Sequence, residues 1–414
     1  MVDPSTLLRR FQPALRYDSN EAFFCDSAAE WTDNPGNVLR RTEDGQPGAI
    51  LAATAPSSGP TELNMAFLGA SEYANKQPVE NEDEIGAPTR NYRAMYVKLR
   101  EQHPEYANRM YGRAKNDSKG RLWLQYWFFY FYNDYNLAGG IGLHEGDWEM
   151  AQLRMGPDGE HPDLALYAQH VHAEQAPWEH VEKPPESPDT PVVYVARGSH
   201  ASYFEAGYHE TEAWYDIADG KRPAPNIELE IIDADPPGWV LWPGRWGATR
   251  ARIPGIDQPS PVGPVKHAQW DDPEKLSDRA QTHARPAALP PPDVVVERKK
   301  GRLVISFDFS TRAGPKPERL VMTVSSRDDA LPPRTFTFAV EPALRGSIET
   351  RIELNDAQRY DVYVSITDAQ GRPSESSLVL IDPVGVESRN LFERIVPPIG
   401  RAIGAILGRV GLRS

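Results

Sequence analysis

The stretch LWLQYWFFYFYND, Leu122–Asp134, decides the fold. It is apolar at successive positions, so both faces of a strand built from it would be apolar, as in a central strand covered on both sides. The segment DWEMAQLRMGPDG, residues 147–159, predicts a second strand that ends in a turn. Further short apolar runs bounded by Pro, Gly, Asp or Asn predict strands at residues 163–174, 191–200, 226–235 and 239–247.

These runs favour an all-β fold, and the composition agrees with it. The 39 prolines and 31 glycines favour short strands joined by turns over long helices. The best helix candidate spans residues 87–114, where Tyr96 and Leu99 fall near helical spacing and Pro104 breaks or kinks the helix. We therefore expect residues 1–285 to form a two-layer β-sandwich with a few helices.

A second unit follows a proline-rich connector at residues 254–290. Beyond it, apolar and polar residues alternate at period two, and Gly301 and Gly371 mark hairpin turns. This pattern predicts a small β-sandwich over residues 286–384. Its segment LNDAQRYDVYVSITDAQGRPSESS resembles the end of a fibronectin type III domain. The spacing from Leu354 to Tyr360 is similar to that family's tyrosine corner, which implies a Tyr hydroxyl pinning the crossover between sheets.

Charge and cysteine content narrow the function classes. The net charge of −14 argues against nucleic acid as the main partner, because phosphate binding needs a basic face. The single cysteine, Cys25, excludes an intrachain disulfide. The N-terminal residues do not read as a cleaved secretory signal, and no window of eighteen apolar residues predicts a transmembrane helix. We expect a cytoplasmic protein, or one exported by a route without a cleaved N-terminal signal.

The last segment, residues 385–414, differs from the rest of the chain because it is basic. Apolar residues form one stripe of a predicted helix, and glycines recur every four residues. One interpretation is an amphipathic helix that binds a membrane surface or a protein partner. The other is a tail helix that packs on its own protein or frays, because each glycine costs about 1 kcal/mol relative to alanine.

The motif HEGDWE, residues 144–149, gathers the side chains that carry chemistry. Asp147 and Glu149 are two residues apart, so on a strand both project from the same face. Gly146 lets the chain turn so that His144 converges on that face. Carboxylates and an imidazole at one apolar spot repel or desolvate one another unless a cation or proton is shared. Oxygen-rich ligation with one imidazole suits Ca or Mg and also Mn, and it suits Zn less without a thiolate.

Nearby segments supply further candidates, although HEGDWE taken alone also fits an exposed turn with solvated charges. Asp134 is a predicted additional cation ligand at the end of the preceding strand, and His200 is another after a glycine turn. Ser199 next to His200 invites a hydrolase interpretation, but the G-x-S-x-G elbow is absent. The residues that we expect to contact a ligand are Glu145, Asn136, His170, His172 and Ser199, with His170 and His172 sharing one strand face.

Four blocks in order, WLQYWFFYFYN, HEGDWE, PVVYVARGSHASYF and GRWG, resemble the vacuolar protein sorting-associated protein 62 family over most of residues 1–285. HEGDWE is also similar to the heptapeptide GHRHDWE of necrosis-inducing, Nep-one-like cytolysins. That resemblance implies a β-sandwich with a divalent cation at the motif, acting on sphingolipid-bearing membranes. It implies His144, Asp147 and Glu149 as motif ligands, with an upstream carboxylate near Asp134 or Asn136 and a later histidine near His200. Gly146 replaces the second motif histidine.

Three functions follow as hypotheses. The first is a divalent-cation-dependent binding or membrane-acting protein that recognises a lipid head group or glycan through the HEGDWE site. The second is a metal-dependent hydrolase that uses the same site, with His144 or His200 as base. The third is a scaffold or interaction protein that acts through the C-terminal sandwich and tail.

Overall fold

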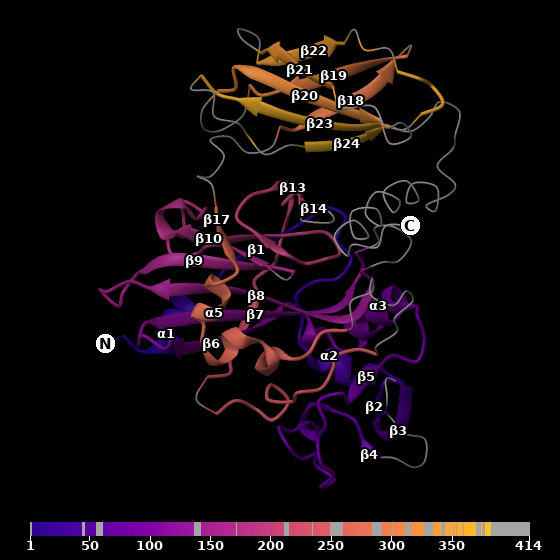
Figure 1. Ribbon diagram of the computed structural model, residues 1–414, viewed down its shortest axis with the longest axis vertical. Helices are drawn as coiled ribbons and strands as arrows, with labels where there is room; N and C mark the ends of the chain where they lie inside the picture. Colours follow the sequence, from indigo (N-terminus) through magenta and orange to yellow (C-terminus); the bar gives the residue numbers. More distant parts are fainter. Residues whose placement is uncertain are drawn as a thin grey trace, which may run out of the picture. The chain divides into compact units, whose positions relative to one another are not determined.

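The structure is a computed structural model of the chain, and its elements are mostly strands (Figure 1). The prediction of an all-β fold with few helices is therefore confirmed. Asn136, Gly371 and the predicted tail at residues 385–414 lie outside the described residues. The structure describes residues 2–43, 46–54, 61–135, 142–170, 172–210, 215–233, 235–248, 260–283, 292–299, 301–310, 316–326, 334–340, 344–350, 352, 354–358, 360–369, 374 and 377–381.

The chain divides into two compact units. The first consists of Met1–Asn136, Gly140–Phe204 and Gly220–His283. The second consists of Leu137–Gly139, Glu205–Asp219 and Ala284–Ser414.

A seven-stranded sheet organises the first unit, in the order β16-β6-β7-β8-β9-β10-β17 (Figure 1). Strands β6 to β10 are antiparallel neighbours, and the two edge strands β16 and β17 pair in parallel with β6 and β10. The bounds are β6 Arg109–Asn116, β7 Leu122–Asn133, β8 His144–Met155, β9 Pro162–Gln169, β10 His172–Pro177, β16 Glu228–Ile231 and β17 Ala280–Thr282.

Two four-stranded sheets and several short helices complete this unit. One sheet has the order β12-β11-β1-β15, with β1 Ala14–Tyr17, β11 Val192–Val195, β12 Ser202–Tyr203 and β15 Arg222–Pro223. The other has the order β4-β3-β2-β5, with β2 Val38–Glu43, β3 Gln46–Ala53, β4 Thr61–Glu62 and β5 Glu84–Gly86. The α-helices are α1 Pro4–Arg10, α2 Ala29–Thr32, α3 Tyr92–Gln102, α4 Ala268–Asp271 and α5 Glu274–Ser277. The 3-10 helices are Met65–Phe67, Pro104–Tyr106, Trp178–His180 and Pro264–Lys266.

Strand β7 lies between two hydrophobic cores, which explains why its sequence is apolar at almost every position. Trp127 and Phe129 belong to one core, which is rich in tryptophan. Tyr126 and Phe128 belong to the other, together with Val193 and other side chains of the β1–β11 sheet. Because successive residues of a strand point to opposite faces, a strand covered on both sides must be apolar at every position. The prediction of a doubly covered central strand is confirmed.

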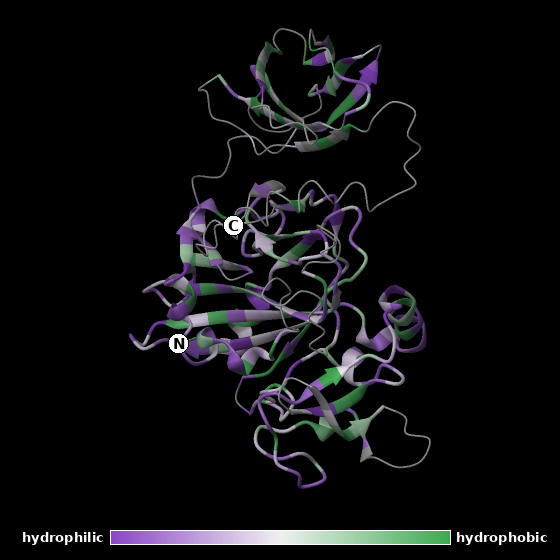
Figure 2. Ribbon diagram, turned by 45° about the vertical axis from the view of Figure 1, so that its right-hand side comes forward, coloured by the Kyte–Doolittle hydropathy of each residue, from purple (hydrophilic) through white to green (hydrophobic). Residues whose placement is uncertain are grey.

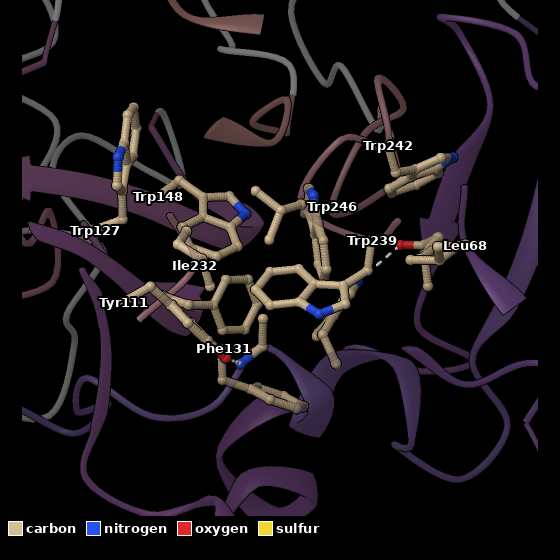
Figure 3. Close-up of a cluster of buried hydrophobic side chains, with 14 of the residues drawn as sticks. Leu68, Tyr111, Trp127, Phe131, Trp148, Ile232, Trp239, Trp242 and Trp246 are labelled. Carbon is tan, nitrogen blue, oxygen red and sulfur yellow. Dashed lines mark hydrogen bonds between the residues drawn. The ribbon is translucent and has the colours of Figure 1, made fainter. Parts of the chain in front are cut away.

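The tryptophan-rich core corrects one prediction. Residues 239–247 were expected to form a strand, but the structure has turns there and an isolated bridge at Arg245. Pro243 has no backbone N–H to donate to a ladder, and Trp242 N–H turns back to the carbonyl oxygen of Trp239 at 3.3 Å. The apolar run buries its indoles instead, and Figure 3 shows Trp239 and Trp246 beside Trp148 of β8.

Two other boundaries also differ from expectation. The helix predicted over residues 87–114 ends at Gln102, because Pro104 starts a 3-10 turn and β6 begins soon after it. The strand predicted over residues 163–174 is a hairpin of β9 and β10, in which His170 has a φ of 52°. A residue in this left-handed region cannot continue a strand.

The second unit contains two sheets around a single core. The sheets have the orders β18-β19-β22 and β21-β20-β23-β24, and Figure 2 shows hydrophobic and hydrophilic residues alternating along their strands. Gly301 sits in the β18–β19 hairpin as predicted. The bounds are β18 Val294–Lys299, β19 Arg302–Asp308, β20 Arg319–Ser326, β21 Arg334–Ala339, β22 Arg345–Glu349, β23 Tyr360–Thr367 and β24 Ser377–Ile381, with a separate hairpin of β13 Gly207–Glu210 and β14 Tyr215–Ala218.

The Tyr360 hydroxyl ties the start of β23 to the chain before it. The backbone N–H of Asn355 donates to this hydroxyl at 3.0 Å, and the hydroxyl donates to Gln358 Oε1 at 2.8 Å. This is the kind of local pin that the Leu354 to Tyr360 spacing predicts.

Candidate functional site

The HEGDWE segment forms the start of β8 and pairs with the last residues of β7. Asn133 is in register with His144, and Tyr130 is in register with Asp147. Gly146, which lies between His144 and Asp147 in the chain, has a φ of 58°, and a Cβ atom on it would lie 2.0 Å from the carbonyl oxygen of Trp246. Only glycine satisfies both conditions, a left-handed backbone and a close backbone approach.

The left-handed Gly146 changes which face of the sheet its neighbours occupy. Asp147 is in register with Tyr130, which belongs to the core shared with the β1–β11 sheet. Glu145 is in register with Tyr132, which belongs to the tryptophan-rich core. In a regular strand, residues two apart share a face, so the alternation is broken at Gly146. His144 consequently lies beside Asp147, although a spacing of three would separate them on a regular strand.

Glu145, a predicted ligand contact, is held inside the protein. It is 2% exposed. Its Oε2 accepts the backbone N–H groups of Ala87 at 3.2 Å and Ala248 at 2.9 Å, and its Oε1 accepts the Tyr92 hydroxyl at 2.7 Å. A carboxylate with three internal donors fixes the chain segments that carry them. We therefore assign Glu145 a structural role.

The imidazole of His144 has a defined tautomer. Its Nδ1 lies 2.7 Å from the carbonyl oxygen of Gly146. A carbonyl only accepts, so Nδ1 carries the proton, and the neutral ring keeps a lone pair on Nε2. That Nε2 lies 3.9 Å from Asp147 Oδ1. Two donor atoms, one nitrogen and one oxygen, therefore face each other at the start of β8.

The other oxygen of Asp147 belongs to a buried charge network. Asp147 Oδ2 accepts from His200 Nδ1 at 2.9 Å and from Asn133 Nδ2 at 3.3 Å. On the far side of the ring, His200 Nε2 lies 3.6 Å from Glu21 Oε1, an ion-pair distance that is too long for a hydrogen bond. The His200 ring also stacks on Tyr130, with centroids 3.9 Å apart. His200 thus sits between two carboxylates.

The surroundings of His200 favour its charged form. Burial acts to lower its pKa, but the charges of Glu21 and Asp147 outweigh it and raise the pKa to about 9. In this charged form the imidazolium offsets the charge of the two carboxylates. The assignment of His200 as a cation ligand stays a prediction.

Glu21 is the site residue that sequence reasoning missed. Its Oε2 accepts the backbone N–H of Gly198 at 2.7 Å, and its Oε1 accepts those of Ala22 and Phe23. Burial acts to raise its pKa, but His200 and these backbone donors lower it. Glu21 lies more than a hundred residues upstream of HEGDWE in an ordinary turn sequence, DSNEAFF, which carries no motif.

The remaining predicted cation ligands are Asp134, which precedes Asp147 in the chain, and Glu149, which follows it. Glu149 is in register with Phe128, is buried, and contributes to a raised pKa of Tyr130 that is due mainly to burial. Asp134 directly follows β7 and has an exposed side chain. Desolvation by nearby protein and the charge of Glu21 raise the Asp134 pKa, whereas His200 acts to lower it. Asp134 is therefore within electrostatic range of the network.

The predicted ligand contacts other than Glu145 are more dispersed. His170 is exposed in the β9–β10 turn, with its ring 5.8 Å from that of Tyr135. His172 begins β10 in register with Gln169, so the turn prevents the two histidines from sharing one strand face as predicted. Ser199 is buried in the turn before His200.

Within the described residues, no three His, Cys, Asp and Glu side chains stand together as a ready-formed metal site. The arrangement is instead a pair of facing donors, His144 and Asp147, beside a buried charge network. Two carboxylates, Glu21 and Asp147, flank a single imidazolium, and the charges of Glu21, His200, Arg93 and Arg197 act on Asp134. The Tyr130 hydroxyl and His200 Nε2 are buried without a hydrogen-bond partner in the described structure. Unsatisfied buried polar atoms are rare in native proteins, so they mark a place where water or a ligand completes the site.

A second group of buried carboxylates consists of Glu30 in α2 and Asp26 just before that helix. Neither oxygen of the fully buried Glu30 has a hydrogen-bond partner in the described structure. Asp26 nearby accepts the Tyr96 hydroxyl at 2.7 Å and pairs with Arg100 at 3.1 Å. Burial raises the pKa of Asp26 to about 6, although Arg100 acts to lower it, and burial raises the pKa of Glu30 well above its ordinary range. The fold therefore retains protons that the unfolded chain would release.

Replacing Glu30 by leucine is expected to stabilise the fold by about 1–3 kcal/mol at neutral pH, because an unsatisfied buried carboxyl is lost. In the parent protein, the contribution of these two groups to stability is largest below the ordinary carboxyl pKa of about 4 and falls as pH rises from there through the folded-state pKa, which is about 6 for Asp26. Urea unfolding at several pH values would show this fall, with a smaller slope in Glu30→Leu. Equal slopes in the two proteins would contradict the assignment.

Comparisons with known proteins leave the family open. No protein-family model matches the chain, and no curated protein matches it. Among solved structures, a necrosis- and ethylene-inducing protein 2 from the causal agent of witches' broom disease of cocoa is similar at 12% identity, with a TM-score of 0.27 over 56% of this chain and 74% of that one. A myokine is similar at 22% identity and a TM-score of 0.20, over 24% of this chain and 97% of that one. The FN5 domain of Drosophila Lar is similar at 15% identity and a TM-score of 0.18, over 23% and 96%.

No helix in the described part of the chain combines the length and the apolar character needed to cross a membrane.

Proposed function

We propose that the edge formed by the end of β7 and the start of β8 binds a divalent cation, and that this cation recruits a lipid head group or glycan. The observation that carries the proposal is the pair of facing donors, His144 Nε2 and Asp147 Oδ1, 3.9 Å apart. The bond from His144 Nδ1 to Gly146 holds the imidazole in the tautomer that a metal ligand needs.

The chemistry of these donors fits a divalent ion. Ligand atoms at roughly 2.0–2.6 Å from one ion lie about 3–4 Å from each other when they are adjacent in its coordination sphere. The nearby carboxylates add negative charge that a cation offsets. One imidazole with oxygen ligands favours Ca or Mg, allows Mn, and favours Zn less in the absence of a thiolate.

Two protein donors would leave most of the coordination sphere open. A bound cation would then act as a Lewis acid toward phosphate, carboxylate or hydroxyl oxygens of a ligand. Asp134, exposed at the end of β7, would contribute a further oxygen directly or through water. The resemblance of HEGDWE to the GHRHDWE heptapeptide of Nep-one-like proteins supports the same assignment, and membership of the vacuolar protein sorting-associated protein 62 family stays part of this proposal.

Metal binding is the first test. Calorimetric titration with Ca²⁺, Mg²⁺ and Mn²⁺ should show a single site, and His144→Ala and Asp147→Asn should each weaken it by at least about tenfold, since each removes a ligand. His144→Ala leaves the Asp147–His200 hydrogen bond intact, so it separates loss of the site from loss of folding. A surface His–Asp pair with the same spacing, Asp158 and His161, offers the matched control variants Asp158→Asn and His161→Ala.

The outcomes separate the two steps of the proposal. Binding of wild type and control variants, with loss in both site variants, supports the cation site. Cation-dependent binding to vesicles or glycan arrays, abolished in His144→Ala, supports the recruitment step. A wild-type protein that binds none of the three ions, or a His144→Ala variant that binds them equally well, would contradict the proposal.

A further inference from the structure

A groove of about 470 Å³ opens next to the buried charge network. One wall is a face of α3 that includes Arg93, Val97 and Arg100, which follow one another at helical spacings of four and three residues. The lining also includes Arg222 of β15 and the carboxylates Glu21 and Glu101. Glu21 also faces His200, so this carboxylate belongs to both the groove and the network.

Aromatic rings line the groove and contact two of its three guanidinium groups, those of Arg100 and Arg222. The Arg222 guanidinium lies 4.3 Å from the centroid of the Phe24 ring. That of Arg100 lies 5.5 Å from the centroids of both Phe24 and Tyr96. A guanidinium that lies over a ring keeps its N–H edge available for a planar or tetrahedral anion. The stacking therefore fixes the positive charge without consuming its donors.

Two of the three guanidiniums have no acidic partner in the described structure. Arg100 pairs with buried Asp26 at 3.1 Å. Arg222 donates to the backbone carbonyl oxygen of Glu21 at 3.4 Å, and no ion pair joins it or Arg93 to a carboxylate of the described residues, although the charge of Arg93 acts on Asp134. Unpaired arginines that gather at one groove are informative in a chain with a net charge of −14.

We infer that this groove binds a phosphate group through Arg93 and Arg222, with an apolar or ring portion of the same ligand against Phe24 and Val97. Guanidinium groups match phosphate oxygens in bidentate geometry, and phosphate offers enough oxygens for two arginines. Val97 is 47% exposed, which leaves apolar surface beside the charged groups. The phosphate could come from a lipid head group or from a soluble phosphoester, and both present the same chemistry.

The inference does not depend on the proposed cation site. It uses different donors, Arg93 and Arg222, and it is tested in EDTA, where no divalent ion is available. If the cation site fails its test, the groove result still stands, and the reverse is also true.

The experiment measures binding of glycerol phosphate and of phosphatidylcholine vesicles with and without phosphatidic acid, all in EDTA. The proteins are wild type, Arg93→Gln/Arg222→Gln, and Arg9→Gln/Arg40→Gln as a control with the same loss of charge away from the groove. The groove variant should bind at least about tenfold more weakly than wild type, because two charge-assisted contacts are lost. The control should stay within about twofold, since it leaves both groove arginines in place and charges farther away are screened.

Each possible outcome either supports or contradicts phosphate binding in the groove. If wild type binds only the vesicles that contain phosphatidic acid, and the groove variant loses this binding, the phosphate comes from a lipid. If wild type binds only glycerol phosphate, and the groove variant loses that binding, the phosphate comes from a soluble phosphoester. Either result supports the inference. Wild-type protein that binds neither probe, or equal weakening of both double variants, would overturn it. Thermal melting of the variants at the wild-type temperature excludes unfolding as the cause, and Arg93→Gln alone provides a milder second variant.

Discussion

Replacing His200 by alanine is expected to lower the free energy of unfolding by about 3–5 kcal/mol, because it leaves buried carboxylates without their counter-charge. His200 is fully buried between Asp147, at 2.9 Å, and Glu21, with a separation of 3.6 Å. Without the imidazolium, these carboxylates either stay charged in a poorly solvated place or take up protons. Urea unfolding of wild type and His200→Ala at neutral pH measures the loss.

A double variant separates lost charge from lost packing. Glu21→Gln in the wild-type background should destabilise, because His200 loses one of its two carboxylates. In the His200→Ala background the same change should cost less or stabilise, because it removes an unpaired buried charge. Additive effects of His200→Ala and Glu21→Gln would show that the loss comes from packing alone and would contradict the charge explanation.

The sequence predicts the strands well where burial determines the pattern. Strand β7 is apolar at almost every position because both of its faces are buried, and this pattern is visible in the sequence alone. The period-two pattern after residue 292 likewise predicts the strands around the second core. Such patterns depend only on which side of a strand is covered, and that is a local property.

The same reasoning failed where apolar residues are buried without a ladder. Trp239, Trp242 and Trp246 look like a strand, yet they pack as turns against β8, because Pro243 and the approach of other segments set the backbone. His170 interrupts a run that looked continuous by adopting a positive φ. A single sequence gives no local signal for either event.

The candidate site was predictable only in part, for a related reason. HEGDWE places its carboxylates and imidazole close together in the chain, so His144 and Asp147 could be proposed together. Glu21 and the protonation of His200 depend on a contact across 179 residues. The internal hydrogen bonds of Glu145, a predicted ligand contact, and of His200, a predicted cation ligand, could not be foreseen for the same reason, since their partners come from distant segments.

Replacing Gly146 by alanine is expected to destabilise the protein by about 2–4 kcal/mol and to weaken cation binding. The loss of stability has two sources, the backbone conformation and a steric contact. An L-residue at a φ of 58° costs about 1 kcal/mol, and a Cβ atom 2.0 Å from the Trp246 carbonyl oxygen forces a backbone shift worth roughly 1–3 kcal/mol. The shift would also move Asp147 away from His144, because the change of face between Glu145 and Asp147 depends on Gly146. Urea unfolding and Ca²⁺ titration measure the two effects.

Gly120 provides the matched control for this substitution. It has a φ of 79°, and an added Cβ would have nothing within 4 Å. Gly120→Ala therefore incurs the backbone cost alone, about 1 kcal/mol, and should leave cation binding unchanged. The difference between the two alanine variants isolates the steric contact with Trp246. Equal destabilisation would mean that the close approach of the Trp246 segment does not hold β8 in place, and the position of His144 beside Asp147 would then need another cause.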